Sequence, residues 1–268
     1  MDFQHLNYKN SLVSFRRFGL GPKLVFCFHG YGEDASSFEF MGKYAGEQFS
    51  FYAIDLPFHG QTVWKDGLSF TVNDLRQIIE KLLDKNNQRL SLLGFSLGGR
   101  IALSLYEAIP GQIEKLILLA SDGLKINFWY WLATQTWFGK KLFAFTMDHP
   151  GWFFGLLKIL NQLHWVNARV YKFVNYYIGD KEARIILYNR WISLRKIKPG
   201  IKQIKSFIKK IKTPVRLVYG KHDRIILPSV GKKFRKGIEE QSSITVIPAG
   251  HQILNETHVS EILSILLD

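Results

Sequence analysis

Six short apolar runs, separated by stretches of helical periodicity, constrain the fold of this chain more than any other feature. The runs cover residues 24–28, 51–54, 90–93, 116–120, 215–219 and 244–247. Several are apolar throughout rather than alternating, which is typical of strands that are covered on both faces of a parallel sheet. Residues 71–83 and 98–109 instead have the spacing of amphipathic helices. The alternation predicts an α/β fold whose mostly parallel central sheet is flanked by helices.

The alternation stops after Ala120 and resumes at Val215. Residues 122–191 hold six of the seven tryptophans and 18 of the 39 aromatic residues of the chain. Helical spacing within this region predicts helices over residues 128–138, 152–163 and 169–178. We therefore expect residues 1–121 and 213–268 to form one core, with residues 122–212 inserted as a helical cap.

The positive charge of the chain is concentrated in one segment. The formal net charge is +14, and residues 190–240 supply 16 basic side chains against Asp223, Glu239 and Glu240. Within this segment, isoleucines at helical spacing alternate with lysines: Ile201, Ile204, Ile208 and Ile211 with Lys202, Lys205, Lys209 and Lys212. This pattern predicts a basic amphipathic helix.

The basic helix has two interpretations. In the first, its lysines form a solvated face over a buried isoleucine stripe. In the second, Lys202, Lys205, Lys209 and Lys212 dock to an anionic membrane surface or to an acidic carrier protein. No nucleic-acid partner is expected, because no recognised binding motif accompanies the charge.

Composition excludes several classes of protein. A length of 268 residues with 47% hydrophobic residues provides a large core in one or two domains. The single cysteine, Cys27, rules out an internal disulfide framework and a cysteine-rich zinc site. No signal peptide and no apolar window of about 18 residues is visible, so a cytoplasmic protein is expected. Neither a cofactor nor a metal is predicted.

The residues around Ser96 carry the strongest chemical signal. Gly94-Phe-Ser-Leu-Gly98 follows an apolar run and precedes a helical pattern. This is the context of a nucleophile elbow, in which a tight turn between strand and helix exposes the serine hydroxyl above the sheet. The pattern predicts Ser96 as a nucleophile.

A serine nucleophile needs a base, and the base needs an acid that orients it. Asp223 and His251 each follow a predicted strand, in the chain order that this arrangement requires. They are therefore the predicted acid and base. Asp122 is the alternative acid, while His222 and His258 are expected to be structural.

The turn after the first strong strand, Phe28-His-Gly-Tyr31-Gly32, has the glycines needed to present a backbone N–H group. We expect the N–H groups of Tyr31 and Leu97 to form an oxyanion hole. His29 lies in the same turn, where a structural hydrogen-bonding role is expected.

Taken together, these motifs resemble those of the α/β-hydrolase-fold serine hydrolases over almost the whole chain. The matching segments are His29-Gly30, Asp55-Leu-Pro-Phe-His-Gly60, Gly94–Gly99, Gly220–Asp223 and Gly250-His251. The family usually has a glycine where this chain has Phe58. The resemblance implies a cap that coincides with residues 122–191, and a serine at the elbow excludes the branches that use aspartate. The chain is similar to small carboxylesterases, including the type that cleaves pimeloyl-carrier-protein methyl ester.

These features predict a serine hydrolase that cleaves a carboxylic ester or thioester with an apolar acyl group through an acyl-enzyme intermediate. A small-molecule or acyl-chain ester is the expected substrate, and the cap aromatics of 122–191 either line its pocket or form a simple core. Two alternatives are a carbon–carbon bond hydrolase with the same three residues and a catalytically silent binding protein.

Overall fold

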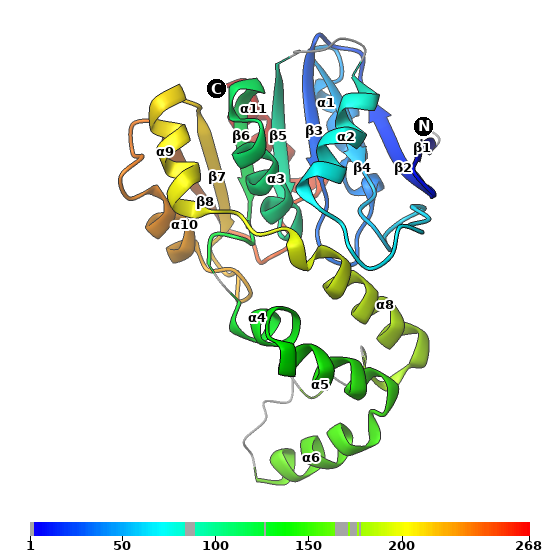
Figure 1. Cartoon of the computed structure of the whole chain (residues 1–268). Coiled ribbons are helices and arrows are strands. Elements are labelled where there is room, and N and C mark those ends of the chain that lie inside the picture. Colours follow the sequence, from blue (N-terminus) through cyan, green and yellow to red (C-terminus); the bar gives the residue numbers. More distant parts are fainter. Residues whose placement is uncertain (1–2, 84–88, 126, 164–170, 172–175, 177) are drawn as a thin grey trace. The chain divides into compact units, whose positions relative to one another are not determined.

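The chain divides into two compact units, which we describe separately. The computed structural model describes residues 3–83, 89–125, 127–163, 171, 176 and 178–268 (Figure 1). One unit, the α/β unit, comprises Met1–Asp66, Phe70–Lys125 and Lys196–Asp268. The other, the helical unit, comprises Gly67–Ser69 and Ile126–Arg195.

An eight-stranded sheet forms the centre of the α/β unit. Its strands are β1 (Gln4–Tyr8), β2 (Ser11–Phe18), β3 (Lys23–Phe28), β4 (Phe49–Ile54), β5 (Leu90–Phe95), β6 (Ile113–Leu119), β7 (Val215–Gly220) and β8 (Ser242–Ile247). The spatial order is β1-β2-β4-β3-β5-β6-β7-β8. The pairs β1–β2 and β2–β4 are antiparallel and the other five pairs are parallel. The predicted α/β fold with a mostly parallel sheet is confirmed.

Helices cover both faces of this sheet (Figure 1). The α-helices of the unit are α1 (Glu39–Ala45), α2 (Val72–Leu82), α3 (Leu97–Ala108), α9 (Ile201–Ile211), α10 (Pro228–Arg235) and α11 (Val259–Leu267). Short 3-10 turns of the unit lie at Ala35–Phe38, Pro110–Gln112 and Glu256–His258, and a further one, Leu194–Lys196, contains the point in the sequence where the helical unit ends. Helices α2, α3 and α9 contact one another in series on one face, and α1 contacts α11 on the other.

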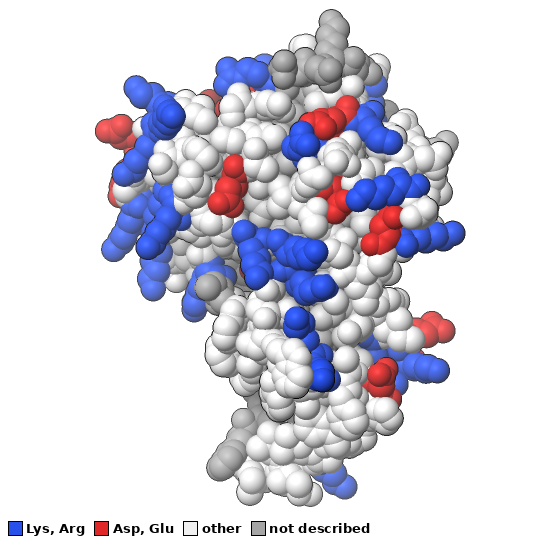
Figure 2. All heavy atoms as spheres, in the orientation of Figure 1, with Lys and Arg blue, Asp and Glu red and all other residues white. Residues whose placement is uncertain are grey.

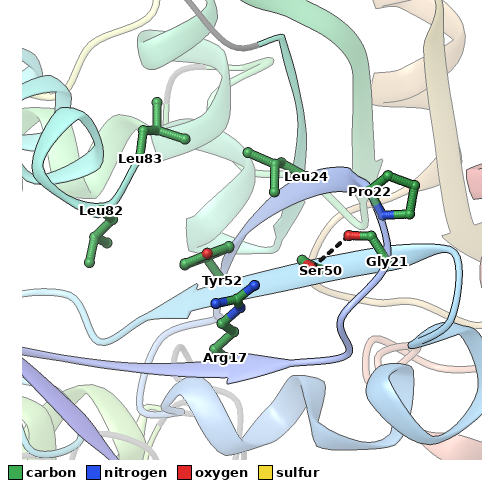
Figure 3. Close-up of a pocket in the computed structure, with 8 residues that line it drawn as sticks. All are labelled: Arg17, Gly21, Pro22, Leu24, Ser50, Tyr52, Leu82 and Leu83. Atoms are coloured by element: carbon green, nitrogen blue, oxygen red, sulfur yellow. Dashed lines mark hydrogen bonds between the residues drawn. The ribbon is translucent and has the colours of Figure 1, made fainter. Parts of the chain in front are cut away.

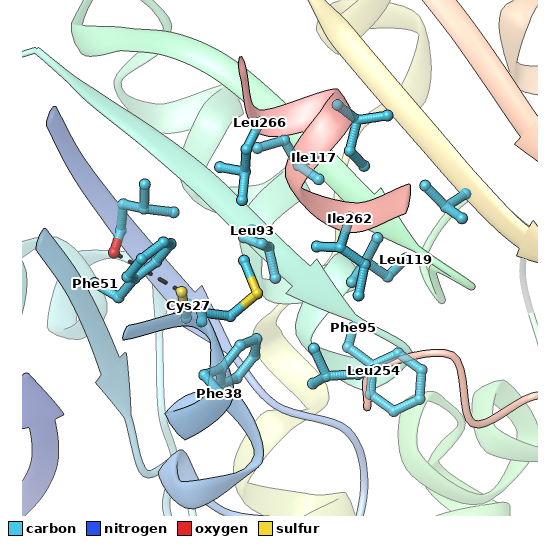
Figure 4. Close-up of a cluster of buried hydrophobic side chains, with 14 of the residues drawn as sticks. Cys27, Phe38, Phe51, Leu93, Phe95, Ile117, Leu119, Leu254, Ile262 and Leu266 are labelled. Atoms are coloured by element: carbon cyan, nitrogen blue, oxygen red, sulfur yellow. Dashed lines mark hydrogen bonds between the residues drawn. The ribbon is translucent and has the colours of Figure 1, made fainter. Parts of the chain in front are cut away.

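A large cluster of buried apolar side chains lies where α1 and α11 pack on the sheet (Figure 4). Phe38 and Met41 come from the first helical segment, and Ile262 and Leu266 come from the last. They meet strand residues that are apolar throughout, as is expected where a parallel sheet is covered on both sides. Cys27 is buried in this cluster, and its thiol contacts the carbonyl of Val25. This core fixes the strands whose carboxyl ends carry the site.

The helical unit contains α4 (Phe128–Gln135), α5 (Trp137–Asp148), α6 (Gly151–Gln162) and α8 (Lys181–Ser193). The single helix predicted over 128–138 is wrong, because Thr136 has extended backbone and its hydroxyl accepts from the N–H of Gly139 as the N-cap of α5. The helix predicted over 152–163 is α6. The one predicted over 169–178 lies largely outside the described residues.

The basic helix lies in the α/β unit and not at the end of the inserted region. The sequence placed residues up to 212 in the cap, but α9 contacts α3, and its Ile204 and Ile208 are fully buried. Burial of these two isoleucines ties α9 to the sheet-covering helices. The described residues include no helix that is both long enough and apolar enough to cross a membrane.

Candidate active site

The strand order places the predicted site residues at one point of the sheet. From β3 the chain moves to β4 on one side, then returns to β5 on the other side of β3. An open α/β sheet forms a crevice at the carboxyl ends of its strands where the order reverses in this way. The turn with Tyr31 follows β3, and Ser96 follows β5, so the two adjoin this crevice.

Ser96 occupies a strained turn between β5 and α3. Its φ is 49° and its ψ is −114°, a conformation that residues with a side chain rarely adopt. Its N–H donates to the carbonyl of Leu119, and its own carbonyl accepts from Asp122 N–H at 2.9 Å. The turn needs Gly98, because a Cβ atom there would lie 1.8 Å from the carbonyl oxygen of Phe28. Close packing of β3 against the start of α3 thus fixes the serine.

Three side chains that are remote in sequence form a hydrogen-bonded series. His251 Nδ1 lies 2.8 Å from Asp223 Oδ2, and His251 Nε2 lies 3.0 Å from Ser96 Oγ. Because the carboxylate can only accept, Nδ1 of the neutral imidazole carries the proton, and Nε2 accepts from the serine hydroxyl. Serine is therefore hydrogen-bonded to a base whose far nitrogen is held by an acid.

Asp223 is the most enclosed of the three. Its side chain has no exposed surface, while that of His251 is 19% exposed. Oδ1 accepts from the N–H groups of Ile225 at 2.7 Å and Ile226 at 2.9 Å, which leaves Oδ2 for the histidine. Three hydrogen bonds to this buried carboxylate fix its orientation. Burial and the nearby charge of Asp223 raise the pKa of the Tyr219 hydroxyl.

The predicted oxyanion donors lie at the ends of the two adjacent strands. Leu97 is the first residue of α3, and N–H groups in a first helical turn have no partner within the helix. Tyr31 lies in the turn after β3, with its ring edge-on to that of His59. Leu97 directly follows Ser96, and Tyr31 follows the strand that pairs with β5, so their N–H groups remain the predicted oxyanion donors.

His29 fixes the turn after β3 through two hydrogen bonds of its ring. It is completely buried, its Nε2 accepts from Leu56 N–H at 3.1 Å, and its Nδ1 donates to the Gly30 carbonyl at 2.8 Å. Burial lowers the pKa of His29, which favours the neutral ring that these two bonds need. The structural role expected for His29 is confirmed.

Two residues that the sequence did not reveal connect the turn after β3 with the loop that carries His251. Glu33 accepts from Gly30 N–H at 3.1 Å and from the Gln252 side-chain amide at 2.8 Å. Glu33 thus ties the turn that precedes Tyr31 to the residue directly after His251. The position of Gln252 directly after the predicted base was the one feature of the sequence that could have identified this pair. No spacing in the sequence indicates a contact with Glu33.

The alternatives considered from the sequence lie elsewhere. Asp122 faces Arg100, with its Oδ2 3.5 Å from the guanidinium Nε, and no contact joins it to His251. His222 is exposed, and His258 ends a 3-10 turn before α11. Of the two candidate acids, Asp223 is the one that contacts the histidine.

Phe58, where the resembling family has glycine, adopts a left-handed backbone with φ of 63°. A glycine would adopt this conformation without strain. Phenylalanine at this position therefore introduces backbone strain, which is confined to a loop. Nearby, Asp55 accepts from the N–H groups of Ala35 and Gln61. The loop keeps its shape through these hydrogen bonds, and the three-residue series at Ser96 is untouched.

A cavity of about 160 Å³ lies at the opposite edge of the sheet, near the amino ends of β3 and β4 (Figure 3). Ser50 donates to the Gly21 carbonyl there, and the guanidinium of Arg17 lies over the ring of Tyr52. No cluster of three His, Cys, Asp or Glu side chains suited to a metal ion occurs in the part of the chain that the structure describes.

Comparison with protein families identifies the family of the chain. Residues 22–258 match the model of the family described as "Serine aminopeptidase, S33". The chain belongs to this family. Its fold, a mostly parallel sheet with flanking helices, makes it an α/β hydrolase, as the motifs predicted.

Two relatives show which proteins this S33-family chain is similar to in sequence. It is 32% identical over 110 residues to a pimeloyl-[acyl-carrier protein] methyl ester esterase of Aeromonas salmonicida (strain A449), covering 41% of this chain and 42% of that esterase. It is 25% identical over 243 residues to a hydrolase of Bacillus subtilis (strain 168), covering 88% and 86%. The matched region thus spans less than half of the esterase and most of the second relative.

Solved structures share the fold at low identity. A thermophilic esterase from Thermogutta terrifontis has a TM-score of 0.69 at 17% identity, covering 100% of this chain and 98% of that one. A thioesterase domain from the curacin biosynthetic pathway has a TM-score of 0.65 at 18% identity, covering 99% of both chains. The S33-family chain therefore has the architecture of hydrolases with several substrate classes.

Proposed function

We propose that this protein is a serine hydrolase that cleaves a carboxylic ester or thioester with an apolar acyl group. The observation that carries the proposal is His251, whose two ring nitrogens lie 3.0 Å from Ser96 Oγ and 2.8 Å from Asp223 Oδ2. An isolated serine hydroxyl is a poor nucleophile near neutral pH, and a positioned base removes this barrier. The strained turn at Ser96 presents that hydroxyl at the carboxyl edge of the sheet.

The proposed reaction has two halves. Ser96 Oγ attacks the acyl carbonyl carbon while His251 Nε2 takes the hydroxyl proton. The tetrahedral intermediate collapses, the bond to the alcohol or thiol breaks, and His251 returns the proton to that leaving group. Water then attacks the acyl-enzyme with His251 again acting as base, and the carboxylic acid and free Ser96 result.

Electrostatics supports both halves. Asp223, with Oδ1 held by two backbone N–H groups, stabilises the imidazolium that forms during each transfer. The N–H groups of Tyr31 and Leu97 would donate to the developing oxyanion, and each such donor is worth about 3–4 kcal/mol. The Glu33–Gln252 hydrogen bond would hold the donor turn and the histidine loop in register.

The apolar acyl group is proposed from the aromatic residues of 122–191 and from the relatives. A pimeloyl-carrier-protein methyl ester esterase and a thioesterase domain are both named for acyl substrates. Aromatic side chains of the helical unit would exclude water from an acyl chain. Carbon–carbon bond hydrolysis by the same three residues and a silent binding protein are the outcomes against which the proposal is tested.

Labelling with a fluorophosphonate separates an enzyme from a silent protein. We expect one covalent adduct on Ser96, because its oxygen is the serine oxygen paired with His251. Ser96→Ala should abolish the adduct, whereas Ser121→Ala should retain it, since Ser121 Oγ donates to the Asp122 carbonyl instead. An unlabelled wild-type protein would contradict the proposal.

A substrate series then identifies the bond. We expect kcat/KM for p-nitrophenyl esters to rise with acyl length and acyl thioesters to be cleaved as well. Aminoacyl p-nitroanilides test the peptide substrates that the family name indicates. Turnover of anilides or of a diketone, with esters left intact, would replace the ester proposal.

A basic surface on α9 and α10 supplies the proposed docking region for an acidic carrier or an anionic membrane (Figure 2). Lys202, Lys209 and Lys212 are exposed, as are Lys232 and Lys233. Lys205 is different, since its Nζ donates to the Lys236 carbonyl and lies over the Phe234 ring. The docking charge would therefore come from the other lysines.

Charge reversal tests this surface. Lys202→Glu with Lys209→Glu and Lys212→Glu should slow turnover of a carrier-bound or vesicle-presented ester at low salt, because exposed charges are screened beyond about 8 Å at physiological salt. A small neutral ester is the control and should be cleaved at the wild-type rate. Equal rates on both substrates would make these lysines a solvated face only.

A further inference from the structure

Helix α5 exposes its apolar residues on one side. Trp137, Phe138, Leu142 and Phe145 are all exposed, with exposed fractions of 68%, 67%, 39% and 52%. Phe138, Leu142 and Phe145 lie one, five and eight residues after Trp137, a spacing that places all four on a single helical face. Lys141 lies on the same face, with its Nζ 4.1 Å from the centre of the Trp137 ring.

The inward side of α5 carries fewer large apolar residues, Phe143 and Met147, than its exposed side. Gly139, Thr146 and Met147 are its buried residues, and the Thr146 hydroxyl donates to the Leu142 carbonyl. A helix of a water-exposed protein ordinarily has the opposite arrangement. The exposed face of α5 is therefore suited to an apolar environment.

Helix α6 repeats the pattern. Its exposed apolar residues are Trp152, Leu156 and Ile159, followed by Leu163 at the C-cap. Leu156, Ile159 and Leu163 lie four, seven and eleven residues after Trp152, and this spacing again places them on one helical face. Trp129, in α4, is 72% exposed. Three neighbouring segments of the helical unit thus present large apolar side chains to the surroundings.

We propose that these faces of α4, α5 and α6 form a surface that binds the head-group region of an anionic phospholipid bilayer. Trp129, Trp137, Phe138, Phe145 and Trp152 would enter the boundary between head groups and acyl chains. Tryptophan rings favour this boundary because they combine an apolar body with a polar N–H. The helices would lie in the plane of the interface and not cross the bilayer.

The charge of these helices favours a lipid surface, and not a second copy of the chain, as the partner. Residues 127–163 contain three basic residues, Lys140, Lys141 and Lys158, and one acidic residue, Asp148. Such a surface attracts anionic head groups, with lysine stems along apolar surface and ammonium groups at the phosphates. Two copies facing each other would instead bring like charges together. Figure 2 shows that most of the helical unit's surface in that view is uncharged.

The test is co-sedimentation of the full chain with vesicles of phosphatidylcholine alone and of phosphatidylcholine with equimolar phosphatidylglycerol. We expect binding to the mixed vesicles that weakens with salt and with removal of the anionic lipid. The triple variant Trp137→Gln, Phe138→Gln and Phe145→Gln should bind at least about tenfold more weakly, since three apolar anchors are lost.

A matched variant controls for loss of exposed apolar surface in general. Leu20→Gln, Val246→Gln and Leu267→Gln change three exposed residues of the α/β unit and should bind vesicles as the wild type does. Thermal unfolding of both triple variants checks that neither is destabilised. Loss of binding in the control alone, or equal binding by the α5 variant, would overturn the proposal.

A second measurement uses the wild-type fold and a conservative change. Brominated acyl chains should quench tryptophan fluorescence on binding, and the double variant Trp137→Phe and Trp152→Phe should remove most of that quenching. Unaltered quenching would place the contact elsewhere, as would loss of binding only on reversal of the α9 lysines. Concentration-dependent dimers in light scattering that the α5 variant abolishes would assign the surface to a second copy and overturn the lipid proposal.

Discussion

Helices α9 and α5 are both lysine-bearing amphipathic helices, yet α9 buries its apolar face and α5 exposes its apolar face. In α9, Ile204 and Ile208 are fully buried and the lysines lie mainly outside. In α5, Trp137, Phe138, Leu142 and Phe145 are exposed, while Gly139, Thr146 and Met147 are buried. The comparison teaches that periodicity identifies an apolar face but does not say whether the protein itself covers that face.

The difference follows from what each helix has to pack on. Helix α9 has α3 beside it, as part of the layer that covers one face of a broad sheet. The described residues of the helical unit form helices without a sheet, and a small unit encloses a small fraction of its surface. Phe143 fills part of its interior, between the rings of Tyr188 and Trp191 at 5.4 Å each. Many of its other aromatic residues remain at the surface.

The largest predicted contrast between the units is catalytic. Ser96→Ala and His251→Ala should lower kcat for esters by about 10⁶-fold and Asp223→Asn by about 10⁴-fold, with little further loss in double variants, because the three act as one unit. Steady-state kinetics with folded variants provides the measurement. Phe138→Ala in the helical unit should leave a small soluble ester's kcat within a few-fold.

Asp122→Asn is the control for the choice of acid. Asp122 contacts Arg100 and not His251, so this variant should retain most activity. Retention by Asp223→Asn together with loss by Asp122→Asn would show that the acid has been assigned to the wrong residue.

The second contrast concerns stability. Ile204→Ala and Ile208→Ala should each lower the free energy of unfolding by about 2–4 kcal/mol, because each removes buried methylene groups and leaves a cavity. Trp137→Ala and Ile211→Ala remove exposed side chains and should change it by less than about 0.5 kcal/mol. Urea unfolding measures both. A large loss for Trp137→Ala would mean that the α5 face is covered within the protein.

Most of the sheet could be predicted from the sequence because buried parallel strands are apolar throughout. All six predicted runs correspond to strands β3 to β8. Strands β1 and β2 were not predicted, since residues such as Gln4, His5, Arg16 and Arg17 break the apolar pattern. These two strands form the antiparallel side of the sheet, where Gln4 and His5 are exposed and the buried Arg16 pairs with Glu39.

The residues of the candidate site were accessible from sequence where a local pattern marks them. Ser96 sits in a glycine-bounded turn, and Asp223 and His251 follow strands, so topology alone brings them to one edge. Glu33 and Gln252 could not be found in this way. Their contact joins residues 219 positions apart and depends on side-chain geometry that no spacing reports.

A third contrast concerns how stability at acidic pH depends on a carboxylate at the start of one helix in each unit. Asp74 is a buried residue in the first turn of α2, where it forms a capping box with the N-cap Thr71, and it also accepts from Tyr8 and Lys9. Burial alone would raise its pKa, but these hydrogen bonds outweigh burial and lower the pKa to about 2. The depressed pKa stabilises the fold above about pH 4, and this contribution, about 2 kcal/mol, is lost as pH falls toward 2.

Asp74→Asn should remove that part of the pH dependence, as measured by urea unfolding between pH 2 and pH 5. Asp180 caps α8 of the helical unit from an exposed position, so Asp180→Asn should leave the pH profile nearly unchanged. An unaltered acid limb in Asp74→Asn would show that other carboxylates control unfolding there.

The smallest predicted effect is a gain of stability in the helical unit. Gly155 lies inside α6, and a Cβ atom added there would meet nothing within 4 Å, in contrast to the 1.8 Å approach at Gly98. Gly155→Ala should raise the free energy of unfolding of this unit by about 0.5–1 kcal/mol, because alanine loses less backbone entropy in a helix. Urea unfolding followed by tryptophan fluorescence suits the measurement, since six of the seven tryptophans lie in residues 122–191. A loss of stability would mean that another part of the protein packs against Gly155, and the exposed face of α6 would then no longer be open to a lipid surface.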